Sequence, residues 1–111
     1  TGWATVCLDS VDHPEDKELL ENSLISDGLQ IILLSEDQIN RFAGNMLEVA
    51  SKLDDTPRIV MSKSAHEALE ATQLDSLSTF GKIISIPLDV IEACGGGSAR
   101  CMMAEIHLPK A

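Results

Sequence analysis

Short apolar segments alternate with polar turns through the first half of the chain, and each has the period of one element type. Segment 3–10 alternates and carries strand-forming residues, so it predicts a strand. Segment 14–26 opens with a proline and acidic residues and has leucines at helical spacing, which predicts an amphipathic helix. The apolar run at 29–35 predicts a buried strand. A capping box that begins at Ser35 predicts a short helix ending before Gly44.

The second half repeats this pattern of short strands around a helix. The predicted elements are strands at 45–51 and 58–62, a helix over 62–80 with a break near Gln73, a strand at 82–87, a short connection at 88–94 and a final strand at 101–109. The chain therefore reads as two similar units, approximately 1–52 and 53–111, within a single α/β (α+β) fragment. The two units share this pattern but no residue-level repeat.

The composition indicates one small globular domain and argues against two partner classes. The chain has 111 residues, of which 44% are hydrophobic. Its 8 basic and 18 acidic residues give a net charge of −10, which repels phosphate backbones and anionic membrane surfaces. We therefore expect neither nucleic acid nor a membrane as a partner. The longest apolar run, 29–34, is far shorter than a bilayer span.

The cysteines and the first residues bear on the setting of the protein. Cys7, Cys94 and Cys101 are an odd number of scattered thiols, which favours a reducing cytoplasmic location over a disulfide framework. Cys94 and Cys101 have no adjacent cysteine or histidine, so no metal site is expected, and no cofactor motif is present. Because the sequence enters a strand at once, without an initial methionine, we expect a fragment of a longer protein.

The most unusual segment is EACGGGSARCMMAEIHLP at 92–109. Glycines permit positive φ and close approach to the backbone, so this turn suits the wall of a ligand site. Cys101 follows the turn and would be a nucleophile if Arg100 and nearby backbone N–H groups lowered its pKa. The residues alone leave open a simpler interpretation, a flexible turn followed by a buried cysteine. No GK[ST] follows the glycines, so the turn is not a phosphate-binding loop.

A base for Cys101 is not found on its own predicted strand. Strand geometry puts Glu105 roughly 13 Å and His107 roughly 20 Å away, beyond hydrogen-bonding reach. His13, in the turn after the first strand, is the one histidine that could approach another strand end.

Three segments resemble a known family. RFAGNMLEV at 41–49, RIVMSKSAHEAL at 58–69 and IEACGGGSARCMMAEIHLP at 91–109 closely resemble the C-terminal part of amidinotransferase-like proteins in the arginine deiminase superfamily. The most similar subgroup is the bacterial citrulline utilisation hydrolases. The resemblance implies a pentein fold, an α/β propeller of five ββαβ-type modules, of which this chain would supply about the last two.

The resemblance also implies roles for particular residues. Cys101 would attack the central carbon of a guanidino or ureido group and form a covalent intermediate that water or a second amine resolves. By contrast, Glu48 would point to solvent or to a neighbouring module. The residues expected to shape the loop or support the site are Asn45, Gly95, Gly96, Gly97, Ser98 and Arg100.

This sequence departs from the family in one respect. The general acid/base histidine and the substrate-binding carboxylates lie in earlier modules, in a motif of the HTN kind that this chain does not contain. We therefore expect a hydrolase whose isolated C-terminal part is inactive. The expected partners are a citrulline- or arginine-like substrate, the upstream modules of the same protein and, through exposed surfaces, further copies of the chain. An amidinotransferase, a non-catalytic pentein-like binding module and a structural thiol protein remain alternatives.

Overall fold

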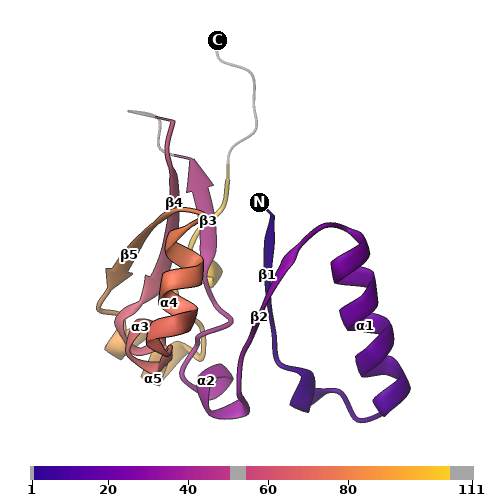
Figure 1. Cartoon of the computed structure of the whole chain (residues 1–111). Coiled ribbons are helices and arrows are strands. Elements are labelled where there is room, and N and C mark those ends of the chain that lie inside the picture. Colours follow the sequence, from indigo (N-terminus) through magenta and orange to yellow (C-terminus); the bar gives the residue numbers. More distant parts are fainter. Residues whose placement is uncertain (1, 51–54, 106–111) are drawn as a thin grey trace.

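The computed structural model describes residues 2–50 and 55–105, which form a mixed α/β structure with two small sheets (Figure 1). This α/β class agrees with the sequence pattern. The elements, in chain order, are β1 (Trp3–Val6), η1 (Leu8–Ser10), α1 (Pro14–Ser26), β2 (Gln30–Leu33), α2 (Glu36–Asn40), β3 (Leu47–Ala50), β4 (Pro57–Ser62), α3 (Lys63–Ala68), α4 (Ala71–Ser78), β5 (Lys82–Ile86), α5 (Asp89–Gly95) and η2 (Arg100–Met102). The predicted division near residue 52 falls in the segment 51–54, outside the described residues, and stays a prediction.

The first sheet is a βαβ unit. β1 and β2 are parallel, with Trp3 opposite Gln30, and α1 connects them. The bounds of α1 match the predicted 14–26, with Pro14 at its first turn. However, no residue of α1 is fully buried, and Leu19 is 69% exposed while Leu24 is half-buried, so its expected apolar face is only partly covered within the described residues. α1 lies on the side of β1 and β2 that faces away from the second sheet (Figure 1).

The second sheet has the order β3-β4-β5, and its topology creates a common edge. β4 and β5 are parallel, with Ser62 opposite Ile86, so their carboxyl ends meet at one edge. β3 is antiparallel to β4 and starts at that edge, with Leu47 opposite Val60. The residues just before β3 and just after β4 and β5 are therefore brought together. Open α/β sheets commonly bind ligands outside the carboxyl ends of their parallel strands.

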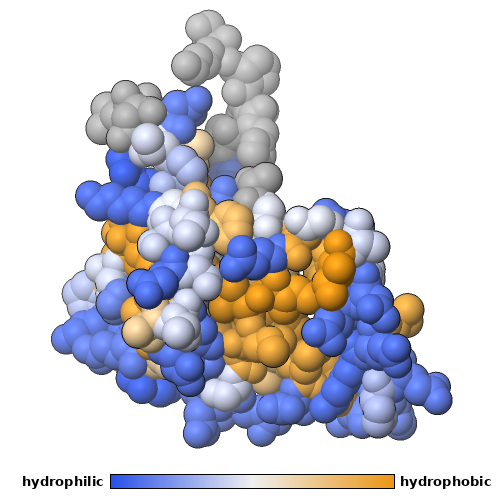
Figure 2. Space-filling model, viewed as in Figure 1, coloured by the Kyte–Doolittle hydropathy of each residue, from blue (hydrophilic) through white to orange (hydrophobic). Residues whose placement is uncertain are grey.

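The core lies between the sheets and under α3 and α4. Its buried residues are Ile32, Leu34, Ala43, Met46, Ile59, Met61, Ala65, Leu69 and Leu77. At the joint between the sheets, the Nε1 atom of Trp3 donates a hydrogen bond to Oε2 of Glu48 at 2.7 Å. Glu48 therefore connects β3 to β1 of the other sheet; of the two directions expected for it, solvent or a neighbouring module, this contact excludes a side chain that points only to solvent. Apolar side chains also reach the surface over the middle of the face shown in Figure 2.

Helix caps decide where two predicted helices begin and end. The Ser35 capping box is present, with Oγ accepting from the N–H of Gln38 at 3.3 Å. The helix it starts ends at Asn40, before Phe42, which has a φ of 63°. The break predicted near Gln73 instead lies at Leu69 and Glu70, both extended, because the Gln73 side chain caps α4 by accepting from the Glu70 N–H at 2.8 Å.

The end of the described chain differs most from the sequence prediction. The connection at 88–94 is the helix α5, and the final strand predicted from Cys101 is absent over 101–105, where η2 and an irregular segment stand. The Met102 N–H donates a hydrogen bond to the Ala99 carbonyl at 3.2 Å, so the backbone forms a tight turn here and does not pair with a neighbouring strand. Residues 106–109 of that prediction, His107 among them, lie outside the described residues. No helix in the part of the chain that the structure describes is long and apolar enough to cross a membrane.

Candidate active site

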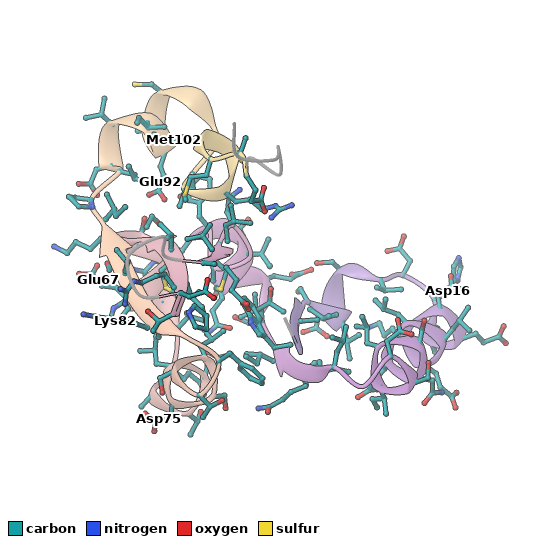
Figure 3. The ribbon with its side chains drawn as sticks, turned by 90° about the horizontal axis from the view of Figure 1, so that it is seen from above. Asp16, Glu67, Asp75, Lys82, Glu92 and Met102 are labelled. Atoms are coloured by element: carbon teal, nitrogen blue, oxygen red, sulfur yellow. The ribbon has the colours of Figure 1, made fainter. Side chains whose placement is uncertain are left out.

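Three segments meet at the common edge of the second sheet. Asn45 precedes β3, Ser62 ends β4 and begins α3, and residues 92–101 follow β5 through α5 and the glycine turn. Glu92 and Met102 lie together at one corner of the molecule, remote from Asp16 of α1 (Figure 3). The site is thus built from segments far apart in the sequence.

Asn45 contacts both the sulfur and the backbone of Cys101. Its Nδ2 donates to Sγ of Cys101 at 2.9 Å. Its Oδ1 accepts from the N–H of Arg100 at 2.9 Å and from the N–H of Cys101 at 3.4 Å. One side-chain amide therefore holds the turn and donates to the sulfur that the turn carries. Sequence reasoning expected a supporting role for Asn45 without identifying this contact.

The surroundings of Cys101 favour its thiolate. The Asn45 hydrogen bond is the main cause that lowers the pKa of the Cys101 thiol, followed by a backbone hydrogen bond from Ser98. Desolvation opposes these two bonds, and the charge of Arg100 makes a smaller contribution that lowers the pKa further. Hydrogen bonds donated to the sulfur stabilise its charged form. The side chain is also exposed, so a reagent or substrate can reach it. A low pKa together with exposure is what distinguishes a reactive cysteine from an inert buried one.

The glycines of the turn differ in what each requires. α5 ends at Gly95, where an added Cβ would meet nothing within 4 Å. Gly96 has a φ of 64° and caps the helix in the left-handed conformation, which favours glycine. A Cβ on Gly97 would lie 3.2 Å from Cβ of Cys101 and 3.6 Å from its Sγ. The third glycine therefore allows the backbone to pass close to the cysteine.

Glu92 is a member of this site that sequence reasoning missed. Ser98 Oγ donates to its Oε1 at 2.6 Å, and Ser64 Oγ donates to its Oε2. Burial by itself would raise the pKa of the Glu92 carboxyl, but hydrogen bonds from Ser62, Ser64 and Ser98 outweigh it and leave that pKa below its ordinary value. The signal available in the sequence was a glutamate one helical turn before the glycines, together with Ser62 at the end of the strand β4 and Ser64 just after it.

Other candidates contribute less to the site. Arg100 is exposed and acts through its charge and its backbone N–H. Among the described residues, no histidine donates to or accepts from Cys101, and no group of three or more potential ligands could hold a metal ion. Cys7 and Cys94 are free thiols, like Cys101. The described part of the chain thus presents an activated, accessible sulfur with no acid or base at its side.

Comparison with known proteins identifies the family. A family model described as N,N dimethylarginine dimethylhydrolase, eukaryotic, matches residues 1–108. No curated protein and no solved structure matches the chain significantly. The pentein superfamily implied by the sequence resemblance is confirmed, although the matching family is not the citrulline utilisation subgroup. With nearly its whole length matched, the chain belongs to the eukaryotic N,N-dimethylarginine dimethylhydrolase family, a family of C–N hydrolases in the pentein superfamily.

Proposed function

We propose that the chain carries the cysteine nucleophile of a hydrolase acting on methylated arginine. The observation that carries this proposal is the contact of Asn45 with the exposed sulfur of Cys101 at 2.9 Å, beside a glycine turn that leaves room around it. Family membership supports the substrate class, because the family is named for the hydrolysis of N,N-dimethylarginine.

The proposed reaction has two steps that balance in atoms and charge. The Cys101 thiolate attacks the central guanidinium carbon, the bond from that carbon to the dimethylated nitrogen breaks, and dimethylamine leaves with an added proton. Water then attacks the resulting thiouronium carbon, the C–S bond breaks, and a ureido product is released with the thiolate restored and two protons set free. One of these protons replaces the proton that dimethylamine took on leaving, and the other converts the released amine to dimethylammonium. The net reaction adds one water across a C–N bond and needs no redox partner.

The residues at the sulfur account for only part of this chemistry. Asn45 and the Ser98 backbone stabilise the thiolate, and the turn exposes it. A guanidinium carbon is a poor electrophile, so the reaction also needs carboxylates that hold the substrate nitrogens and an acid that protonates the amine. We propose that upstream modules of the same protein supply these groups. The 111-residue chain alone is then expected to be inactive.

Alternative activities start from the same sulfur. An amidinotransferase would share the first step and let an amine replace water in the second. A citrulline-directed hydrolase would attack a ureido carbon and pass through a carbamoyl-type intermediate. A non-catalytic binding module is favoured by the lack of an acid or base hydrogen-bonded to Cys101 among the described residues. A cytoplasmic location stays a prediction from the reduced thiols.

Covalent labelling tests the proposal. The protein that contains this chain, and the chain alone, would be incubated with N,N-dimethylarginine, arginine, citrulline or a haloacetamidine, and then analysed by intact mass and peptide mapping. We expect an adduct on Cys101 at neutral pH that is lost in Cys101→Ser and kept in the matched control Cys94→Ser, with dimethylamine formed only by the whole protein. Equal labelling of Cys7, Cys94 and Cys101 would contradict the nucleophile assignment, and turnover of citrulline or transfer to an amine would favour an alternative.

A further inference from the structure

We propose that Glu92 is a positioning residue for the nucleophile, because its carboxylate fixes Ser98 and thereby the backbone that faces the Cys101 sulfur. This inference rests on the proposed function, since it matters only if Cys101 is the reacting group. It concerns a residue that lies outside the glycine turn and whose carboxylate binds Ser64 and Ser98 and not the sulfur itself.

Both oxygens of the Glu92 carboxylate are already occupied. Oε1 accepts from Ser98 at 2.6 Å, and Oε2 accepts from Ser64, which lies in α3 after β4. Ser62, fully buried at the end of β4, lies beside Ser64 with 3.2 Å between the two hydroxyl oxygens. A carboxylate held in this way is suited to joining segments of the protein. It is less suited to receiving a guanidinium.

Ser98 transmits this anchoring to the nucleophile. Its hydroxyl binds Glu92 and the residue is 0% exposed. The backbone just before it passes close to the nucleophile, since a Cβ on Gly97 would lie 3.6 Å from Sγ of Cys101. The contacts thus run from α3 through Glu92 and Ser98 to Cys101. Each link lies at the common edge of the second sheet.

The glycine turn makes such an anchor necessary. Residues 95–97 are three consecutive glycines, which have more backbone freedom than any other residue type. Without a fixed point just after them, the backbone of the turn would sample many directions and would lie close to the sulfur only part of the time. Glu92 lies six residues before Ser98, on the helix that leads into the glycines. The hydrogen bond between them therefore joins the two ends of the glycine turn.

A pH profile of Cys101 alkylation separates a positioning role from a merely structural one. Iodoacetamide would be applied to the intact folded protein over a range of pH, and the rate at Cys101 followed by peptide mapping. For Glu92→Gln we expect a rate at neutral pH lower by about two- to tenfold, the range for one lost hydrogen bond, and a midpoint moved to higher pH. The matched control Asp89→Asn removes one negative charge from the same helix and should leave both the alkylation rate and the midpoint unchanged.

Two further variants keep the test decisive. Ser98→Ala should slow Cys101 to a similar extent, and combining it with Glu92→Gln should add little, because both act through one chain of contacts. If Glu92→Gln does not fold, the comparison of Ser98→Ala with Ser64→Ala replaces it, and both are expected to slow alkylation. A folded Glu92→Gln or Ser98→Ala with the parental rate and midpoint would overturn the inference, as would fully additive effects.

Failure of the proposed function gives a different result. In that case, in the unsubstituted protein, Cys101 would be alkylated no faster than Cys94. The midpoint of its pH profile would then equal the midpoint measured for the protein unfolded in denaturant. That outcome would overturn both proposals, whereas an activated Cys101 that is insensitive to Glu92→Gln would overturn only the present one.

Discussion

The side-chain amide of Asn45 donates to the sulfur of Cys101 at 2.9 Å although the two residues are 56 positions apart in the sequence. The same amide accepts two backbone N–H groups of the segment that carries the sulfur. Activation of the thiol and anchoring of its turn therefore depend on one side chain.

Asn45→Ala should make Cys101 less reactive. Loss of the main hydrogen bond to the sulfur raises the pKa of the thiol toward its ordinary value, so less thiolate is present at neutral pH. We expect alkylation of Cys101 at neutral pH to slow by about two- to tenfold, the range for one hydrogen bond. Peptide mapping after timed iodoacetamide treatment measures this. Asn22→Ala, an exposed asparagine on α1, is the matched control, and an unchanged rate in Asn45→Ala would contradict the assigned cause.

Gly96→Ala should destabilise the fold, whereas Gly95→Ala should not. Gly96 has a φ of 64°, where a Cβ costs about 1 kcal/mol or more, while Gly95 ends α5 with open space around it. Urea unfolding at neutral pH gives the free energy of unfolding of each variant. We expect a loss of about 1 kcal/mol for Gly96→Ala and no loss for its neighbour. Equal stabilities would show that the left-handed cap is not required.

Glu92 should contribute a stability that depends on pH. Its pKa is lowered in the folded protein, so its hydrogen bonds stabilise the fold above the unfolded-state pKa of about 4.3. That contribution is lost as the pH falls through the lowered folded-state pKa. Glu92→Gln cannot titrate at this position. The difference in free energy of unfolding between the two proteins should therefore be largest near neutral pH and shrink below about pH 4.

Urea unfolding at a series of pH values measures this difference. Glu18→Gln, an exposed position on α1, removes a similar charge and should show no such narrowing. A difference that is constant with pH would mean that the serine hydroxyls do not favour the charged carboxylate.

We predict that the isolated chain self-associates through apolar side chains near the site. Val90 of α5 is 75% exposed and Met102 is 54% exposed, and exposed apolar groups of this kind promote association. Sedimentation at increasing concentration should show dimers or larger species that Val90→Asp reduces. Leu19→Asp, which changes a similarly exposed residue on α1, should have a smaller effect. A monodisperse monomer at high concentration would contradict the prediction.

The sequence predicted best the features that short segments determine. Pro14 and the acidic first turn placed α1, and the Ser35 capping box placed the start of α2, because both signals act within a few residues. The final strand failed over its described part, residues 101–105, for the opposite reason. The apolar residues after Cys101 suit a strand, but Asn45, distant in sequence, takes the backbone N–H of Cys101, and a tight turn forms. A contact between residues so far apart in the sequence leaves no periodic pattern from which it could be predicted.

The site was predicted in the same uneven way. Cys101 and its glycine turn stand out because glycines, a cysteine and a family resemblance coincide in one segment. Glu92 does not stand out in the sequence. Its partners Ser64 and Ser98 come together only because α3 and α5 follow β4 and β5, which pair as parallel neighbours in the sheet. The helix α5 itself could have been predicted, since Pro87 precedes it and a glycine ends it.

The bond from Trp3 to Glu48 at the joint of the two sheets places the only tryptophan of the chain where its fluorescence reports their docking. The reactivity of Cys101 reports on a different place, the edge where β4 and β5 end. Recording both probes through one denaturant titration distinguishes a cooperative two-state transition, in which they coincide, from separate opening of the βαβ unit. Trp3 fluorescence and Cys101 reactivity thus give this chain one optical and one chemical reporter, each on a different part of the fold.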